Sequence, residues 1–281
     1  MKCSTPLTQT PKVNHMLLDG RKVALITGAG SGIGRALTIE AINRGYHIVA
    51  VGRRLQPLQE TAVIAGKPAQ IHLLSVDVTS AKGRLYLVKE ITETYGHLNI
   101  LINNAGTLNV GHFKDLSDDD MQNMVSLNLV APALMARDCL PLLKQAGGAS
   151  IVNVGSVFGD IAYPYFAGYS ATKFGLRGLS DALRRELRKD DINVTYLAPR
   201  AAKTDATSKY EKLVGPMEMK LDQPDVIAKQ SWDAIEAKKH ECHPWGLERL
   251  FIKIQRWFPK LIDQNIIKQA QSKPVLAALE K

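Results

Sequence analysis

Tyr169 and Lys173 lie four residues apart in the stretch YSATK, and this spacing would place both side chains on one face of a helix. A lysine ammonium beside a phenol favours the phenolate, which lowers the phenol pKa from its usual value of about 10. Such a phenol can give a proton to a carbonyl oxygen or take one from an alcohol. Many helices carry a tyrosine and a lysine at this spacing without doing chemistry, so the pair needs support from other residues.

Ser156 offers that support, because it stands thirteen residues before Tyr169 and just after the apolar run 151–154. That run has the composition of a buried strand. Parallel α/β sheets bind ligands at the carboxyl ends of their strands, where a serine hydroxyl can hold a substrate oxygen. We therefore expect Ser156, Tyr169 and Lys173 to meet at one edge of a sheet.

Short apolar runs and longer stretches with helical spacing alternate along the chain. This alternation predicts an α/β fold in which helices cover both faces of a parallel sheet. The expected architecture is a doubly wound Rossmann fold with three layers, α/β/α, in one domain over residues 21–245. The six expected strands are 23–26, 48–51, 71–74, 100–102, 151–154 and 194–197.

The composition of the chain excludes several classes of protein. Of its 281 residues, 45% are hydrophobic and 22% charged, which is usual for a globular protein, and three distant cysteines argue against a disulfide framework. The sequence shows no secretory signal and no run of about 18 apolar residues, so we expect a cytoplasmic protein. The net charge of +9 comes from scattered residues, which argues against nucleic-acid binding. Residues 1–20 are polar and aperiodic and are expected to form a flexible arm.

The sequence TGAGSGIG (27–34) sits between the first expected strand and a helix expected at about 32–44. Gly28, Gly32 and Gly34 would let the chain turn tightly and let phosphates approach a helix N-terminus, whose free N–H groups attract anions. The spacing is not Gly-x-Gly-x-x-Gly, and a glycine-rich turn without a ligand would look alike. Its place at the start of a strand–helix–strand unit favours a dinucleotide site.

Arg53 and Arg54 follow the second expected strand, where an acidic residue would bind the ribose hydroxyls of NAD(H). A guanidinium matches a 2′-phosphate instead, which favours NADP(H) as the cofactor. Arg53 is the first candidate for this contact and Arg54 the second. An ordinary charged helix start is the alternative interpretation.

Several segments together resemble the short-chain dehydrogenase/reductase family, in its single-domain type. The resemblance runs over residues 21–204, and the motifs occur in the order of that family. They are TGAGSGIG (27–34), DV (77–78), NNAG (103–106), SLN (126–128), NVGS (153–156), YSATK (169–173) and the pair Pro199 and Thr204. Independent motifs in one order are specific, so the chain is identified as a member of this family.

The resemblance implies a catalytic tetrad in this chain. Tyr169 would be the acid or base, and Ser156 would orient and polarise the carbonyl group. Lys173 would bind the nicotinamide ribose and lower the tyrosine pKa. Asn128 would hold a water that links Lys173 to solvent.

The resemblance also implies how NADP(H) would be held. Asp77 would meet the adenine beside the backbone of Val78, and Thr204 would lie near the nicotinamide carboxamide. Asn104 would line the cofactor or instead stabilise the central sheet. The expected cofactor residues are Gly28, Ser31, Gly32, Ile33, Gly34, Arg53, Arg54, Asp77, Val78, Asn104, Ala105, Gly106, Tyr169, Lys173, Pro199 and Thr204.

Two positions depart from the pattern of the family. Arg200 stands where a glycine usually follows Pro199, so it would either bind an acidic group of the substrate or point to solvent, and both interpretations stay open. Gly155 replaces the first of two usual serines, which we expect to be harmless. The polar residues 205–225 correspond to the substrate-binding lid of the family, with Leu213, Met217 and Met219 as a potential apolar cover.

Residues 246–281 are expected to form an amphipathic helical extension that Pro259 kinks or breaks. Basic residues fill the face opposite the apolar one. The extension would either pack over the substrate pocket or another subunit of a homo-oligomer, or lie on a membrane surface. The apolar residues are Leu247, Leu250, Phe251, Ile254, Trp257, Phe258, Leu261 and Ile262.

The stretch HECH contains His240, Cys242 and His243, but no fourth ligand follows at a regular spacing. We therefore predict no metal site there and expect a surface turn before Pro244.

The sequence as a whole predicts an NADP(H)-dependent oxidoreductase that acts on a small carbonyl or alcohol substrate, apolar or acyl-like in character. The alternative is an NADP(H)-binding sensor or scaffold without turnover, against which the complete tetrad argues. A nucleotide-sugar epimerase or dehydratase on the same fold is disfavoured by the glycine spacing and by the short chain after the sixth strand.

Overall fold

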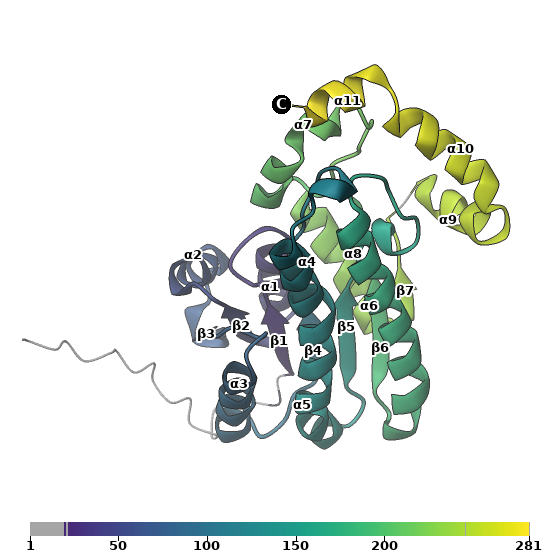
Figure 1. The fold of residues 1–281 in the computed structure, drawn as a ribbon. Helices are drawn as coiled ribbons and strands as arrows, with labels where there is room; N and C mark the ends of the chain where they lie inside the picture. The colour runs from purple at the N-terminus through teal and green to yellow at the C-terminus, as the bar shows by residue number, and fades with distance from the viewer. Residues whose placement is uncertain (1–19, 21, 245, 281) are drawn as a thin grey trace, which may run out of the picture.

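The computed structural model describes residues 20, 22–244 and 246–280, so the predicted arm lies outside the described residues except for Gly20. Within those ranges seven parallel strands form one sheet in the order β3-β2-β1-β4-β5-β6-β7 (Figure 1). The order reverses between β1 and β4, which makes the switch point of a doubly wound fold. The strands are β1 Val23–Thr27, β2 His47–Gly52, β3 Ile71–Ser75, β4 Ile100–Asn103, β5 Ser150–Val154, β6 Asn193–Leu197 and β7 Glu241–Cys242.

The central strands are buried on both faces, because successive residues join two different apolar clusters. In β1, Val23 and Leu25 belong to one cluster, whereas Ala24 and Ile26 belong to the other. This arrangement confirms the predicted three layers and explains the continuous apolar runs in the sequence. The first cluster lies under α3 Ala81–Thr94, α5 Ala131–Ala146 and α6 Ala167–Glu186, and the second under α1 Gly32–Asn43, α2 Leu55–Ala65 and α8 Pro224–Glu236.

Helix α4, Asp118–Val125, continues through one π-helical turn, Ser126–Val130, into α5. This continuous helix, Asp118–Ala146, is the one segment of the described chain that is long and apolar enough to cross a membrane, by length and composition alone. Cys139 and its neighbours Met135 and Leu143 are buried against the sheet, so the segment packs as a core helix.

Strand β7 corrects the expectation of a surface turn at HECH. The N–H of Tyr196 donates to the carbonyl of His240 at 2.9 Å, and the N–H of Ala198 donates to that of Cys242 at 2.8 Å. A strand of two residues is too short to show a periodic pattern. His243 lies within 3.0 Å of the carboxylate of Asp160, and in the described part of the chain no group of three His, Cys, Asp or Glu residues is placed to hold a metal ion.

The lid and the helices after β7 build the end of the molecule beyond the carboxyl ends of the strands, where α7 and the C-terminal helices form an arch (Figure 1). Helix α9 ends at Trp257 and α10 begins at Pro259, which confirms the predicted break at this proline. Proline is well suited to the first position of a helix, because the N–H group that it lacks would have no partner within the helix there. The elements are a 3₁₀ turn at Asp205–Lys209, α7 Glu211–Val214, α9 Glu248–Trp257, α10 Pro259–Ala270 and α11 Lys273–Leu279.

Candidate active site

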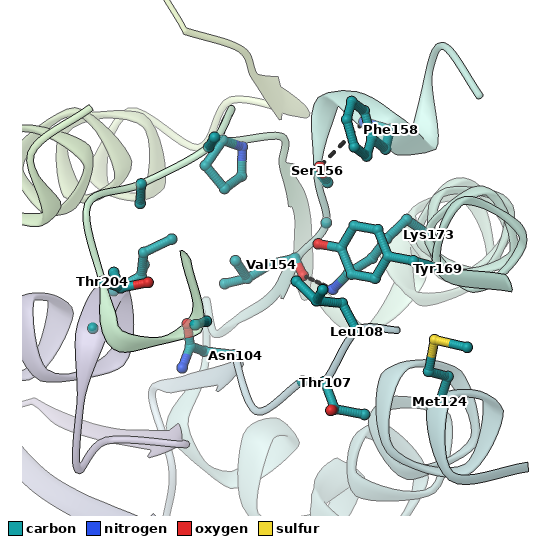
Figure 2. Close-up of a pocket in the computed structure, with 18 of the residues that line it drawn as sticks. Asn104, Thr107, Leu108, Met124, Val154, Ser156, Phe158, Tyr169, Lys173 and Thr204 are labelled. Atoms are coloured by element: carbon teal, nitrogen blue, oxygen red, sulfur yellow. Dashed lines mark hydrogen bonds between the residues drawn. The ribbon is translucent and has the colours of Figure 1, made fainter. Parts of the chain in front are cut away.

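A cavity of about 1450 Å³ opens at the carboxyl ends of the central strands. It runs from the glycine loop at 27–34 past the ends of β2, β4, β5 and β6 to the lid and α9. Its lining includes every predicted cofactor residue except Arg54, and it includes Ser156 and Arg200. Figure 2 shows Tyr169 and Lys173 projecting into this space, with Asn104 and Thr204 across from them. The fold therefore brings the separate sequence motifs to one place.

The glycine loop requires glycine at three positions for two reasons. Gly28 and Gly32 have φ angles of 69° and 52°, which residues with a Cβ rarely adopt. A Cβ on Gly34 would lie 2.1 Å from the carbonyl oxygen of Gly28, so no side chain fits. Helix α1 begins at Gly32, the hydroxyl of its N-cap residue Ser31 makes no capping bond, and the first residues of the helix line the cavity. Such a helix start suits a pyrophosphate.

The two arginines after β2 occupy different places. Arg53 lines the cavity, whereas Arg54 lies outside the lining as the exposed N-cap residue of α2. Asp77, also in the lining, accepts hydrogen bonds from the N–H and hydroxyl of Thr79 at 2.9 and 2.7 Å. Burial raises the pKa of the Asp77 carboxyl, but the bonds from Thr79 and the charge of Arg53 outweigh it, and the pKa falls below its usual value. This end of the cavity thus holds one charge of each sign.

Asn104 chiefly joins two strands. Its side-chain N–H donates to the carbonyl of Thr27 at 2.9 Å. The hydroxyl of Thr27 in turn accepts the backbone N–H groups of Asn104 and Ala105, both at 3.0 Å. These bonds fix the end of β4 against the end of β1. Of the two interpretations of Asn104, the geometry favours the stabilisation of the central sheet.

Ser156, Tyr169 and Lys173 meet as expected, with Ser156 at the end of β5 and the other two on α6. The Lys173 amine lies 5.6 Å from the centre of the Tyr169 ring and donates to the carbonyl of Val154 at 2.8 Å (Figure 2). The Ser156 hydroxyl accepts the N–H of Phe158 at 3.1 Å. Both α6 side chains are therefore held at the cavity wall, beside a hydroxyl fixed in position.

The pKa values correct one expectation. Burial raises the pKa of Tyr169 to about 12, and a hydrogen bond to Ser156 opposes this rise. Burial also lowers the pKa of Lys173 to about 8. The predicted lowering of the tyrosine pKa by the lysine charge is thus absent here, because desolvation disfavours the charged form of both groups. In this structure Tyr169 is a protonated phenol at neutral pH.

Asn128 sits in the π-helical turn behind the cavity wall and is fully buried. Its side-chain oxygen accepts the N–H of Thr107 at 2.8 Å, and its nitrogen donates to the carbonyl of Thr107 at 2.8 Å and to the hydroxyl of Thr172 at 3.1 Å. The side chain therefore clamps the loop after β4 to α6. Both N–H groups of the amide are used, so the contact with a water that the resemblance implied would use the second lone pair of the side-chain oxygen or the backbone of this turn.

A contact that sequence reasoning missed explains Gly155. A Cβ at this position would lie 2.1 Å from the ring of Tyr196 on β6. The Tyr196 hydroxyl donates to the carbonyl of Ser156 at 3.1 Å and accepts its N–H at 3.3 Å. Gly155 makes room for a ring that holds the backbone of Ser156, so the departure from the usual serine has a structural reason.

Arg200 lines the cavity, but its guanidinium is bound by the protein. It forms two bonds with Asp222 at 2.8 and 2.7 Å and one with Glu248 of α9 at 2.6 Å. Its side chain is 16% exposed, so the interpretation as a solvent-facing residue is wrong. To bind an acidic substrate group, the arginine would have to leave two carboxylates. In this structure it connects the end of β6 to the lid and the extension.

The lid packs against the extension rather than standing alone. Leu213 and Met217 are buried in one cluster with Phe166 and with Val275 of α11, which explains the apolar residues predicted as a cover. From the lid, the Lys209 amine also lies 3.2 Å from the carbonyl of Leu108, across the cavity. The substrate end of the cavity is thus assembled from distant parts of the chain.

Comparison with known proteins assigns the fold and the site to a family. Residues 22–214 match the family model of the short chain dehydrogenases. The chain belongs to the short-chain dehydrogenase family. Helices α8 to α11 lie beyond the matched range. An uncharacterized oxidoreductase of Staphylococcus aureus (strain USA300) is 30% identical over 219 residues, which cover 78% of this chain and 93% of that protein.

Solved structures of short-chain dehydrogenases superpose on most of this chain. One from Streptomyces avermitilis is 26% identical, with a TM-score of 0.76, and the match covers 90% of this chain and 98% of that one. A structure of actinorhodin polyketide ketoreductase with NADPH is also 26% identical, with a TM-score of 0.75 and coverage of 82% and 97%. As a short-chain dehydrogenase, this protein is an oxidoreductase with a nucleotide-binding Rossmann fold.

Proposed function

We propose that this protein is an NADP(H)-dependent oxidoreductase that reduces a carbonyl group, or oxidises the corresponding alcohol, with Tyr169 as the acid or base. One observation carries the proposal: Tyr169, Lys173 and Ser156 converge in the same cavity as the open N-terminus of α1. When bound, NADP(H) supplies or accepts the hydride.

The residues of the cavity fit this cofactor. The free N–H groups at the start of α1 suit its pyrophosphate, and Arg53 suits a 2′-phosphate. Asp77 would meet the adenine, and Thr204, whose side chain lies against Gly32, would lie near the nicotinamide end. A structural relative, an alcohol dehydrogenase from Thermococcus sibiricus that is 25% identical, was solved with 5-hydroxy-NADP.

The protonation states favour the reductive direction. A phenol with a pKa of about 12 is protonated at neutral pH, so Tyr169 can give a proton to the carbonyl oxygen as the carbon accepts hydride. The Ser156 hydroxyl would donate a hydrogen bond to the same oxygen and stabilise the negative charge that develops on it in the transition state. Lys173, charged below a pKa of about 8, would stabilise the phenolate that remains.

The wall beside the tyrosine points to an apolar substrate. Tyr169 packs against a cluster that contains Phe158, Phe166 and Met217, all of which line the cavity. The guanidinium of Arg200, which also lines the cavity, is already paired with two carboxylates. We propose a small apolar or acyl-like carbonyl compound as the substrate, in a cytoplasmic enzyme that forms homo-oligomers.

Replacement of the phenol tests the proposed reaction. NADPH oxidation would be followed with a panel of apolar aldehydes and ketones, for the wild type and for Tyr169→Phe. We expect the variant to lose at least about a hundredfold in kcat, because its ring keeps the packing but has no proton to give. NADPH binding, measured by its fluorescence, should stay within a few-fold. Equal turnover in the two proteins would contradict the role of Tyr169, and tight NADPH binding without turnover of any carbonyl would favour a sensor.

Replacement of the arginine tests the cofactor preference. Arg53→Ala should weaken NADPH binding much more than NADH binding, because only NADPH carries the 2′-phosphate. Arg54→Ala is the matched control, since Arg54 lies outside the cavity lining. Equal weakening of both cofactors by Arg53→Ala would contradict the assignment.

A further inference from the structure

The outer face of α9 and its corner with α10 is apolar and exposed. We call it the α9–α10 apolar face; it comprises Leu247, Leu250, Phe251, Trp257, Phe258 and Leu261, which are 66, 52, 43, 80, 63 and 57% exposed. A different side of α9 packs inward through Ile252, which is 5% exposed. Single exposed apolar residues are common, but six along one short segment mark an interaction surface.

The charge around this face indicates its partner. Residues 247–273 contain six basic and two acidic residues, a net charge of +4. One of the two acids, Glu248, already pairs with Arg200, and one of the six bases, Arg256, lies 3.7 Å from the carboxylate of Asp160 and 3.9 Å from that of Glu241. Lys253 and Lys260 are exposed and lie among the apolar residues along the chain. Aromatic and aliphatic side chains beside basic ones are typical of segments that lie on anionic membranes.

A second copy of the chain fits this face less well. A twofold dimer through the α9–α10 apolar face would bring the same positive segment of both copies together, because such an interface uses the same patch twice. The repulsion would oppose the apolar contact. An anionic membrane instead attracts the basic residues and accepts the apolar ones.

The face adjoins the mouth of the active-site cavity. Phe251 belongs to both, since it is exposed on α9 and also lines the cavity. Its neighbour Ile252 and Gln269 of α10 line the cavity as well. A membrane in contact with this face would therefore lie next to the opening that leads to Phe158 and Tyr169.

We propose that the α9–α10 apolar face docks on an anionic membrane surface, and that the enzyme takes an apolar carbonyl or alcohol substrate from that membrane. The docking stands on the surface alone, whereas the route of the substrate rests on the proposed function. Figure 1 shows the helices concerned at the outer edge of the molecule, away from α3.

The docking is tested by flotation of the full chain with phosphatidylcholine vesicles, with and without phosphatidylserine. The test variant is Trp257→Ser/Phe258→Ser, because neither residue lines the cavity. The matched control is Leu85→Ser/Tyr86→Ser on α3, where two adjacent apolar residues are 73 and 47% exposed. A third variant, Lys253→Glu/Lys260→Glu, tests the contribution of charge.

We expect the wild type and the α3 control to float with phosphatidylserine vesicles and the Trp257→Ser/Phe258→Ser variant to bind at least about tenfold more weakly. The Lys253→Glu/Lys260→Glu variant should lose the preference for phosphatidylserine. Absence of flotation, or equal flotation of the wild type and Trp257→Ser/Phe258→Ser, would overturn the proposal. A wild-type dimer that this variant converts to monomers, without flotation of either, would identify a second copy as the partner.

The route of the substrate needs a separate assay. NADPH oxidation is measured with hexadecanal held in the vesicles and with water-soluble benzaldehyde. Trp257→Ser/Phe258→Ser should lose about fivefold or more with hexadecanal and little with benzaldehyde, because only the former enters from the membrane. Equal losses would contradict the route. If neither aldehyde reacted with the wild type, the proposed function would fail for these substrates, while flotation would still decide the docking.

Discussion

The two ends of the cavity are constructed differently. At the cofactor end the backbone is tightly packed, because a Cβ on Gly34 would overlap the carbonyl of Gly28 and because Thr27 holds the start of the loop after β4. At the substrate end, the contacts come from side chains, such as the ion pairs of Arg200 and the packing of Met217 against Val275. The glycine loop of the first end therefore tolerates no added side-chain volume, whereas the contacts of the second end can be altered by single charges.

The largest effect is expected at the cofactor end. In Gly34→Ala the new Cβ would lie 2.1 Å from a backbone oxygen, so the loop must move, at a cost of about 3 kcal/mol in the free energy of unfolding. NADPH binding should be lost with it. The control is Gly178→Ala on α6, where a Cβ meets nothing within 4 Å and should stabilise the helix by up to about 1 kcal/mol. Urea unfolding and NADPH titration measure both, and normal cofactor binding by Gly34→Ala would contradict the comparison.

The next effect concerns the contact between Gly155 and Tyr196. Gly155→Ser should destabilise the protein by about 2 to 3 kcal/mol, since its Cβ would overlap the tyrosine ring. Tyr196→Val removes that ring and should recover part of the loss in the double variant. A double-mutant cycle of unfolding free energies measures the coupling. Additive effects would show that the serine is excluded for another reason.

A smaller effect is expected from a single charge at the substrate end. Arg200→Gln leaves Asp222 and Glu248 without their partner and should cost roughly 1 to 2 kcal/mol, because the pairs are partly buried. The KM of the carbonyl substrate should rise more than that of NADPH. Arg44→Gln is the matched control, because Arg44 also binds carboxylates of Asp233 and Glu236, but between α1 and α8. A rise in the substrate KM for both variants would remove the difference between the two ends.

The most gradual effect is a dependence of the free energy of unfolding on pH, to which Lys173 and Tyr169 contribute. Lys173 has a pKa of about 8 in the folded protein and 10.5 ordinarily, so above pH 8 the unfolded chain binds more protons. Lys173 should therefore contribute a rise in the free energy of unfolding of the cofactor-free protein from pH 8 to 10, by at most about 1.4 kcal/mol per pH unit. Cys139 and Tyr169 oppose this contribution from about pH 9, because their raised pKa values make the folded state bind more protons than the unfolded chain. In Lys173→Met the rise should vanish, and an identical slope in both proteins would contradict the burial of a neutral lysine.

The sequence allowed prediction of the sheet and of most of the residues that line the cavity, because strands and glycine turns have local patterns and the motifs resemble those of the family. Apolar runs reveal strands that are buried on both faces, and glycines reveal turns that no other residue can make. The sequence placed both Arg53 and Arg54 after β2, so it could rank them but could not show which one reaches the cavity. In the structure only Arg53 lines the cavity.

The parts that escaped prediction depend on distant contacts. The partners of Arg200 lie 22 and 48 residues away, and the ring that excludes a side chain at Gly155 belongs to β6. The direction of the Tyr169 pKa shift depends on how deeply the phenol is buried, which no spacing of Tyr and Lys shows. Strand β7 has no periodic signal of its own, because it is defined by its bonds to β6.

Lys209 connects the lid to the loop after β4 across the cavity. Its amine lies 3.4 Å from the hydroxyl of Thr107 and 3.2 Å from the carbonyl of Leu108, and these contacts are exposed to solvent. An ammonium held by two neutral oxygens in contact with water is released at little cost. The lid can therefore separate from the loop after β4 at this point without any change in the backbone contacts of the glycine loop.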